Sequence, residues 1–269
     1  MRAGRALTIA SYLAPCAFPA YQVAARLIGL HLDVGVRFVE GDSPRQLLTG
    51  EVDAAFLCGL PYVRLADRDP RPLTAIAAPV LAGRRYGGQP VYFSDVIVRR
   101  DDPARTLEDL PGRAFAYNEE TSYSGWLVVW HHLGLRGPRP GFTLSPTLRT
   151  GSHQASIAAV SDGQADWAAI DSQVLAITVR NKPRLAARLR VLESLGPSPV
   201  PPFVTRTAIP EAVRKGMAEA LRDAAGFAFA RGALAGAGIT GFVEACDADY
   251  DPIRLVAGSS RYAGLASIA

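Results

Sequence analysis

The chain has 269 residues, 49% of them hydrophobic and 20% charged, which is ordinary for a water-soluble globular protein and leaves room for two lobes of about 100–130 residues. The net charge of +4 comes from arginines spread along the chain, without the dense basic block that typifies nucleic-acid binding. No apolar run reaches the about 18–20 residues of a membrane span, and the three cysteines lie too far apart for a zinc site. We therefore expect no nucleic-acid partner, no metal and no cofactor.

Short β-rich runs alternate with helical stretches, a pattern typical of an α/β fold with mixed, mostly parallel sheets flanked by helices. In chain order, strands are expected at residues 7–11, 35–40, 53–58, 73–78, 91–99, 114–117, 167–171, 190–193 and 202–206. Helices are expected at residues 19–30, 43–49, 61–66, 124–133, 153–161, 173–179 and 210–230.

One local pattern occurs twice, about 113 residues apart along the sequence. Gly50 and Gly163 each follow a helix, Asp53 and Asp166 stand three residues later, and an apolar strand comes next. The glycines fit the left-handed position that ends a helix. Any αβ junction can look like this, but two such units favour two similar lobes.

The lobe boundaries are expected at the two places where the chain passes from one lobe to the other. Residues 195–202 contain four prolines and read as a loop or hinge, and the first crossing is expected near residues 92–94. The prediction is a discontinuous first lobe of residues 1–94 with 200–269, and a second lobe of residues 95–199.

The most informative stretch is a hydroxyl-rich turn between a strand and a helix. Thr121, Ser122 and Ser124 stand with Tyr123 at the start of the helix expected from residue 124. Free backbone N–H groups at a helix start, with hydroxyls beside them, can cradle an anion. The alternative interpretation is an ordinary N-cap.

Two further positions sit where ligands bind in α/β proteins. His153 lies in the first turn of a predicted helix and could donate to an anion; a surface or capping histidine is the alternative. Asp171 ends a predicted strand, at the edge where open α/β sheets bind ligands, or else it caps the next helix. Tyr12, Tyr62 and Tyr92 lie near strand ends or the crossing and could line a pocket.

In this order and spacing, the motifs resemble the phosphate/phosphite/phosphonate-binding proteins of ABC importers, which have the type II periplasmic-binding-protein fold. The similarity runs along nearly the whole chain, through residues 50–63, 92–115, 122–125, 150–157, 166–172 and 250–254. Ser122-Tyr-Ser-Gly125 resembles the family's Ser-Thr-Ser-Gly turn, and Thr150-Gly-Ser-His-Gln-Ala-Ser-Ile157 its Gly-x-His-x-x-Ser helix start.

The resemblance implies a solute-binding protein, not an enzyme, that closes around a small phosphonate-like or phosphate-like oxyanion between two lobes. It implies a membrane permease as partner and a monomer. It also implies ligand contacts from residues shared with the family: Tyr62, Tyr92, Ser122, Ser124, His153 and Asp171. We add Tyr12 from the first lobe. Tyr123 replaces the family's middle threonine and is expected to reshape the pocket.

Two questions stay open at this point. The positively charged start of the chain superficially resembles a lipoprotein signal, but Pro15 before Cys16 argues against cleavage there. We expect a periplasmic or extracytoplasmic location, with the cytoplasm as the alternative. The functional alternative is a cytosolic enzyme of the same fold, of the menaquinone-route type, with His153 or Asp171 as general base.

Overall fold

The computed structural model describes residues 6–135 and 146–259. The basic start of the chain considered above as signal-like therefore lies outside the described residues. Contacts divide the chain into two units: unit 1 comprises Met1–Val91 with Pro199–Ile253, and unit 2 comprises Tyr92–Ser198 with the described part of Arg254–Ala269. The expected first lobe, residues 1–94 with 200–269, differs from unit 1 in three ways: it includes residues 92–94, it leaves out Pro199, and it extends past Ile253.

Unit 1 is built on a six-stranded sheet in the order β11-β4-β10-β3-β1-β2. Its strands are β1 (Leu7–Ser11), β2 (Val36–Glu40), β3 (Ala54–Phe56), β4 (Leu73–Leu81), β10 (Phe203–Arg206) and β11 (Ile239–Glu244). Strand β1 pairs in parallel with β2 and β3, whereas β10 runs antiparallel to β3 and β4, and β11 antiparallel to β4. The sheet is therefore mixed, with parallel pairing concentrated at one edge.

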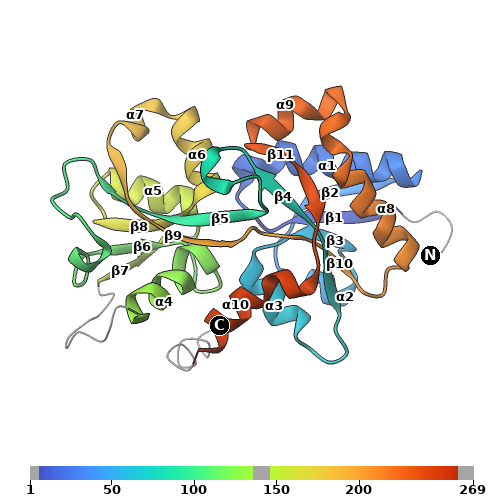
Figure 1. The fold of residues 1–269 in the computed structure, drawn as a ribbon, viewed down its shortest axis with the longest axis horizontal. Coiled ribbons are helices and arrows are strands. Elements are labelled where there is room, and N and C mark those ends of the chain that lie inside the picture. The colour runs from blue at the N-terminus through green and yellow to red at the C-terminus, as the bar shows by residue number, and fades with distance from the viewer. Residues whose placement is uncertain (1–5, 136–145, 260–269) are drawn as a thin grey trace. The chain divides into compact units, whose positions relative to one another are not determined.

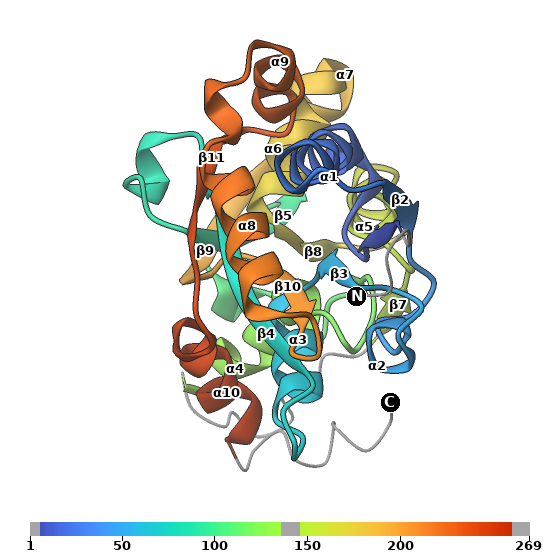
Figure 2. The same ribbon diagram turned by 90° about the vertical axis from the view of Figure 1, so that its right-hand side faces the viewer.

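The helices of unit 1 are α1 (Phe18–Leu32), α2 (Gln46–Thr49), α3 (Gly59–Ala66), α8 (Glu211–Arg222) and α9 (Ala228–Gly236), with α10 (Asp251–Gly258) beginning at its end. Helices α1, α8 and α9 pack together over the sheet (Figure 2). The single helix predicted over residues 210–230 was wrong. Phe227 adopts an extended backbone (φ −84°, ψ 121°) that ends the short 3₁₀ turn Ala224–Gly226 and separates α8 from α9.

Unit 2 has a five-stranded sheet in the order β7-β6-β8-β5-β9. Its strands are β5 (Val91–Arg99), β6 (Phe115–Tyr117), β7 (Thr147–Arg149), β8 (Trp167–Asp171) and β9 (Leu189–Pro199). Strand β6 runs parallel to both β7 and β8, and β5 runs antiparallel to β8 (Figure 1). The α/β fold with two mixed sheets is thus confirmed.

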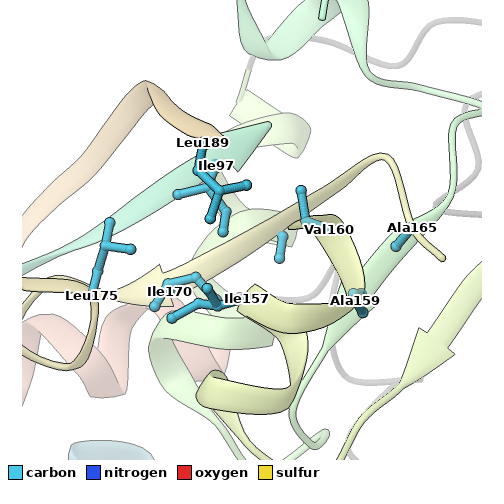
Figure 3. Close-up of a cluster of buried hydrophobic side chains, with 10 residues drawn as sticks. Ile97, Ile157, Ala159, Val160, Ala165, Ile170, Leu175 and Leu189 are labelled. Atoms are coloured by element: carbon cyan, nitrogen blue, oxygen red, sulfur yellow. The ribbon is translucent and has the colours of Figure 1, made fainter. Parts of the chain in front are cut away.

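The core of unit 2 lies between one face of this sheet and α5 (His153–Ser161) and α6 (Ser172–Asn181). Ile170 of β8 faces Ile157 and Val160 of α5 (Figure 3). Because side chains alternate along a strand, Ala168 belongs to the same cluster. The opposite face carries an aromatic stack, with the Phe115 and Trp167 ring centroids 4.1 Å apart. Two further helices, α4 (Val128–Leu135) and α7 (Pro183–Ala186), complete the described part of the unit.

The proline-rich stretch at residues 195–202 is more regular than predicted. Strand β9 runs through it to Pro199, so the expectation of a loop from residue 195 was wrong. The physical reason is the place of β9 at the edge of its sheet, where a residue without an N–H costs no hydrogen bond on the open side. Within the described residues, no helix combines the length and the apolar character needed to cross a bilayer.

Candidate functional site

Polar groups gather at the carboxyl edge of the unit 2 sheet. Strands β6, β7 and β8 run in the same direction, so their last residues meet at one edge. Each is followed by the first turn of a helix: β6 by a π-helical turn, β7 by α5 and β8 by α6. Open α/β sheets bind their ligands at this edge.

The first helix start is a π-helical turn at Tyr123–Leu127, which continues into α4. Its backbone bonds span five residues, with Leu127 N–H donating to the Ser122 carbonyl at 3.1 Å. Ser122 is the N-cap, and its Oγ accepts from Gly125 N–H at 3.0 Å. At its place in the first turn, the N–H of Ser124 has no intrahelical acceptor. The turn thus combines a side-chain cap with a first-turn N–H group that has no partner within its own helix.

Ser124 joins this turn to the second helix start. Its Oγ lies 3.3 Å from Nε2 of His153, the first residue of α5. Ser124 is 3% exposed, and Ser152, the N-cap of α5, accepts from Ala155 N–H at 3.1 Å. Two helix N-termini and their serine hydroxyls therefore converge on one serine–histidine pair.

His153 is held in its neutral form. Burial lowers the pKa of its imidazole to about 4. Its Nδ1 atom is buried and, among the described residues, no group lies within hydrogen-bonding distance of it. A neutral imidazole carries one N–H, so the site offers a directional donor and not a cation.

Asp171 ends β8 at the same edge and caps α6. Its Oδ1 accepts from Gln173 N–H at 2.7 Å and Val174 N–H at 3.2 Å, which realises the capping alternative stated above. Burial raises the pKa of Asp171 to about 6, against the lowering effect of these two hydrogen bonds. The nearby Asp95 carboxylate adds to the increase.

Asn118, Gly125 and Ser94 also belong to this edge, although sequence reasoning gave none of them a role in binding. Asn118 follows β6, and its Oδ1 is buried without a partner among the described residues. It packs so closely on Gly125 that a Cβ there would overlap Oδ1. Ser94 Oγ donates to the Ser124 carbonyl at 2.6 Å. The position of Asn118, one residue past a strand, could have revealed it.

Two predicted tyrosines of unit 2 are buried. Tyr92 is 2% exposed at the start of the unit. Tyr123 is 3% exposed, and its hydroxyl accepts from Ser198 Oγ at 3.3 Å. Tyr123 thus makes a buried hydroxyl contact to β9, and its expected effect on the shape of a ligand pocket stays a prediction.

Tyr12 and Tyr62 belong to unit 1. Tyr12 is half-buried, its hydroxyl donates to Gln46 Oε1 at 3.1 Å, and burial, with the nearby Glu51 and Asp42 carboxylates, raises its pKa to about 12. Tyr62 is fully buried; its hydroxyl donates to Asp247 at 2.6 Å and accepts from Ala75 N–H at 3.0 Å. These contacts place Tyr62 in the core of unit 1, and its expected role as a ligand contact stays a prediction.

The sequence of residues 28–250 matches the family described as "ABC transporter, phosphonate, periplasmic substrate-binding protein". The chain belongs to this family. No curated protein matches the sequence. The resemblance drawn from the motifs is thereby confirmed.

Solved structures share the fold at low sequence identity. A binding-protein component of an ABC phosphonate transporter from Pseudomonas aeruginosa is 19% identical, with a TM-score of 0.79 over 94% of this chain and 85% of that one. PhnD1 from Prochlorococcus marinus, solved with methylphosphonate, is 17% identical, with a TM-score of 0.80 over 94% and 97%. A Xanthomonas citri protein bound to ATP is 20% identical, with a TM-score of 0.66 over 93% and 95%.

Membership of this family answers the broad questions left open by the sequence. The chain is the solute-binding component of an importer, its partners are a small ligand and a membrane permease, and the family is extracytoplasmic. The enzyme alternative is not supported, because the family consists of substrate-binding proteins.

Proposed function

We propose that the protein binds a phosphonate or a phosphate-like oxyanion at the carboxyl edge of the unit 2 sheet. The oxyanion would accept hydrogen bonds from the first-turn N–H groups and the hydroxyls of Ser122 and Ser124, with His153 donating beside them. The observation that carries the proposal is the contact of Ser124 Oγ with His153 Nε2 at 3.3 Å, where two helix N-termini meet.

The chemistry of this edge favours an anion held by neutral donors. Backbone N–H groups at helix starts carry partial positive charge, and hydrogen bonds to a charged acceptor contribute about 1.5–3 kcal/mol each. Four such bonds sum to about 6–12 kcal/mol before the cost of ordering the site, a range that includes the about −8 kcal/mol of micromolar binding. PhnD1 of Prochlorococcus marinus, which shares this fold, was solved with methylphosphonate, which supports a phosphorus oxyanion as the class to test first.

Asp171, Tyr92 and Tyr12 stay predictions as ligand contacts. Asp171 can accept a hydrogen bond from a ligand that carries a proton or an amine, since the cap uses one of its two carboxyl oxygens. We also propose that the protein acts as a monomer in the extracytoplasmic space.

The test starts with thermal unfolding against phosphate, phosphite, methylphosphonate, aminoethylphosphonate, methanesulfonate and acetate. A ligand at 100 times its Kd stabilises the folded protein by about 2.7 kcal/mol. Calorimetry on Ser124→Ala and His153→Ala should then show at least tenfold weaker binding of the best ligand. Ser161→Ala is the matched control, because Ser161 is equally buried at the far end of α5. Unchanged affinity in both site variants would refute the proposal.

A further inference from the structure

Two hydroxyl groups hold the anion-binding turn from strands outside it. Ser94 Oγ, on β5, donates to the Ser124 carbonyl at 2.6 Å. Ser198 Oγ, on β9, donates to the Tyr123 hydroxyl at 3.3 Å. Ser94, Ser198 and Tyr123 are 3%, 7% and 3% exposed, so both contacts are shielded from water. Tyr123 and Ser124, which are consecutive in the turn, are thus hydrogen-bonded to two different strands.

These two strands have a special place in the chain. Unit 2 spans Tyr92–Ser198, so β5 carries the chain into the unit and β9 carries it out. Ser94 lies two residues after the start of the unit, and Ser198 is its last residue before the chain returns to unit 1. Both hydroxyl contacts to the turn therefore lie close to the places where the chain passes between unit 1 and unit 2.

The strand β5 is also tied to the other helix start at this edge. Ser94 pairs in register with Asp171, and Phe93 N–H donates to Ser172 Oγ at 3.1 Å. Asp171 and Ser172 begin α6. One short stretch of β5 thus fixes the π-helical turn and the start of α6 relative to each other.

We infer that Ser94, Tyr123 and Ser198 are positioning residues, which hold the N–H groups of the turn in the geometry that the oxyanion needs and couple that geometry to the two crossing strands. This inference rests on the proposed function for its ligand. It gives Tyr123, the residue by which the turn departs from the family's Ser-Thr-Ser-Gly pattern, a defined task. The family's smaller hydroxyl is replaced by one that reaches β9.

A π-helical turn makes such support necessary. Its bonds span five residues, a geometry that proteins use in single turns and seldom in longer runs. A short buried hydrogen bond to the Ser124 carbonyl limits the movement of the neighbouring N–H groups. Removing it leaves that buried carbonyl with fewer donors and frees the turn to relax toward a tighter helix.

The experiment compares Ser94→Ala, Tyr123→Phe and Ser198→Ala with Ser194→Ala. The control removes a hydroxyl that donates to Asp95 at 2.6 Å, again between β9 and β5, but away from the turn. At a temperature where all four variants remain folded, methylphosphonate affinity should fall about tenfold in the three variants and less than twofold in the control. Tyr123→Phe with Ser198→Ala should be no weaker than either alone, because both remove one contact. Ser94→Thr, which keeps the hydroxyl, should restore binding.

Amide hydrogen exchange of the ligand-free protein provides the second measurement. The N–H of Gly125 should exchange faster in Ser94→Ala and Tyr123→Phe than in Ser194→Ala. If the wild type binds methylphosphonate and the three variants bind as tightly as the control, the inference is wrong. If the wild type binds none of the oxyanions, the proposed ligand is wrong, and the exchange rates alone decide: rates equal to the control overturn the positioning role, and faster rates support it.

Discussion

Units 1 and 2 repeat one arrangement of three strands with different chemistry at its end. In unit 1, β3 lies between parallel β1 and antiparallel β10; in unit 2, β8 lies between parallel β6 and antiparallel β5. Asp53 and Asp166 precede the central strands and accept from Thr8 N–H and Ala114 N–H, both at 2.9 Å. An aspartate at the equivalent position therefore supports the equivalent strand pair in each unit.

The two units differ where the central strands end. After β3, the N-cap position of α3 is Cys58, which makes no side-chain capping hydrogen bond; after β8, the N-cap of α6 is Asp171, whose carboxylate caps the helix. Unit 2 adds the capping serines Ser122 and Ser152 at the helix starts that follow β6 and β7. A repeated scaffold thus fixes the strands, and the residues after the strands give one unit its polar edge. Five predictions test this division.

The largest effect is expected from a methyl group placed at the first turn after a strand. In unit 2, Gly125→Ala would force its Cβ onto Asn118 Oδ1, and the π-helical turn must shift. We expect methylphosphonate binding to weaken at least 100-fold in calorimetry. Gly59→Ala is the matched change in unit 1, where the Cβ would overlap Cδ1 of Ile253, the far end of a flexible side chain. Equal affinity of the two variants would contradict the special role of the turn.

Replacing Asp53 or Asp166, the aspartates that precede the central strands, should lower the free energy of unfolding more where the side chain is more deeply buried. The Asp53 side chain is 5% exposed and that of Asp166 is 33% exposed. Removing a buried acceptor leaves its donor without a partner at a cost of about 1–3 kcal/mol. Asp53→Ala should therefore lower the free energy of unfolding by ~3 kcal/mol and Asp166→Ala by ~1 kcal/mol, as measured by urea denaturation. The reverse order would show that burial does not set the strength of this contact.

The polar edge should also show itself in the pH dependence of stability. The pKa of His153 is lowered to about 4, so the folded protein binds fewer protons there than the unfolded chain between about pH 6.5 and 4. Relative to wild type, His153→Gln should gain stability as the pH falls through that range, by ~2–3 kcal/mol.

Asp171 should act in the opposite direction in nearly the same range. Its pKa is raised to about 6, so the folded protein binds more protons there than the unfolded chain between about pH 4 and 6. Asp171→Asn keeps a capping side chain and should gain stability over wild type as the pH rises through that range. Urea titrations from pH 4 to 7 measure both differences, and a constant difference for either variant would show that its pKa is not shifted by folding.

The smallest effect is expected for the hydroxyl of Tyr62. Tyr62→Phe removes the contacts to Asp247 and Ala75 N–H and should cost ~1–2 kcal/mol of unfolding free energy with no change in ligand affinity. Tyr21→Phe in the core of the same unit is the comparison for stability. A tenfold loss of affinity in Tyr62→Phe would instead support the ligand-facing role that the family resemblance implied.

Much of the fold could be read from local sequence patterns. Strands at 7–11, 91–99 and 167–171 and the helix at 153–161 have the predicted bounds, because apolar runs and capping serines mark them locally. The strands β7 and β11 were not predicted. One has three residues, and the other carries Gly241 beside a register shift against β4.

The candidate site was predictable in its residue types and not in its contacts. Ser122, Ser124 and His153 were identified from helix-start motifs, and the structure brings Ser124 and His153 together. The π-helical turn was not foreseen, because its residues have no spacing that distinguishes them from an α-helix. Asp247, which accepts a hydrogen bond from the Tyr62 hydroxyl, lies 185 residues away in the sequence, so no local pattern could predict the contact.

The position of Pro197 and Pro199 in β9 has a further consequence for how the protein behaves at high concentration. An open strand edge is a template onto which strands of other chains can add, the first step of edge-to-edge aggregation. Proline lacks the N–H that such an added strand would need as a donor. The last stretch of β9, on the edge of its sheet, therefore resists pairing with neighbouring molecules while it remains a strand.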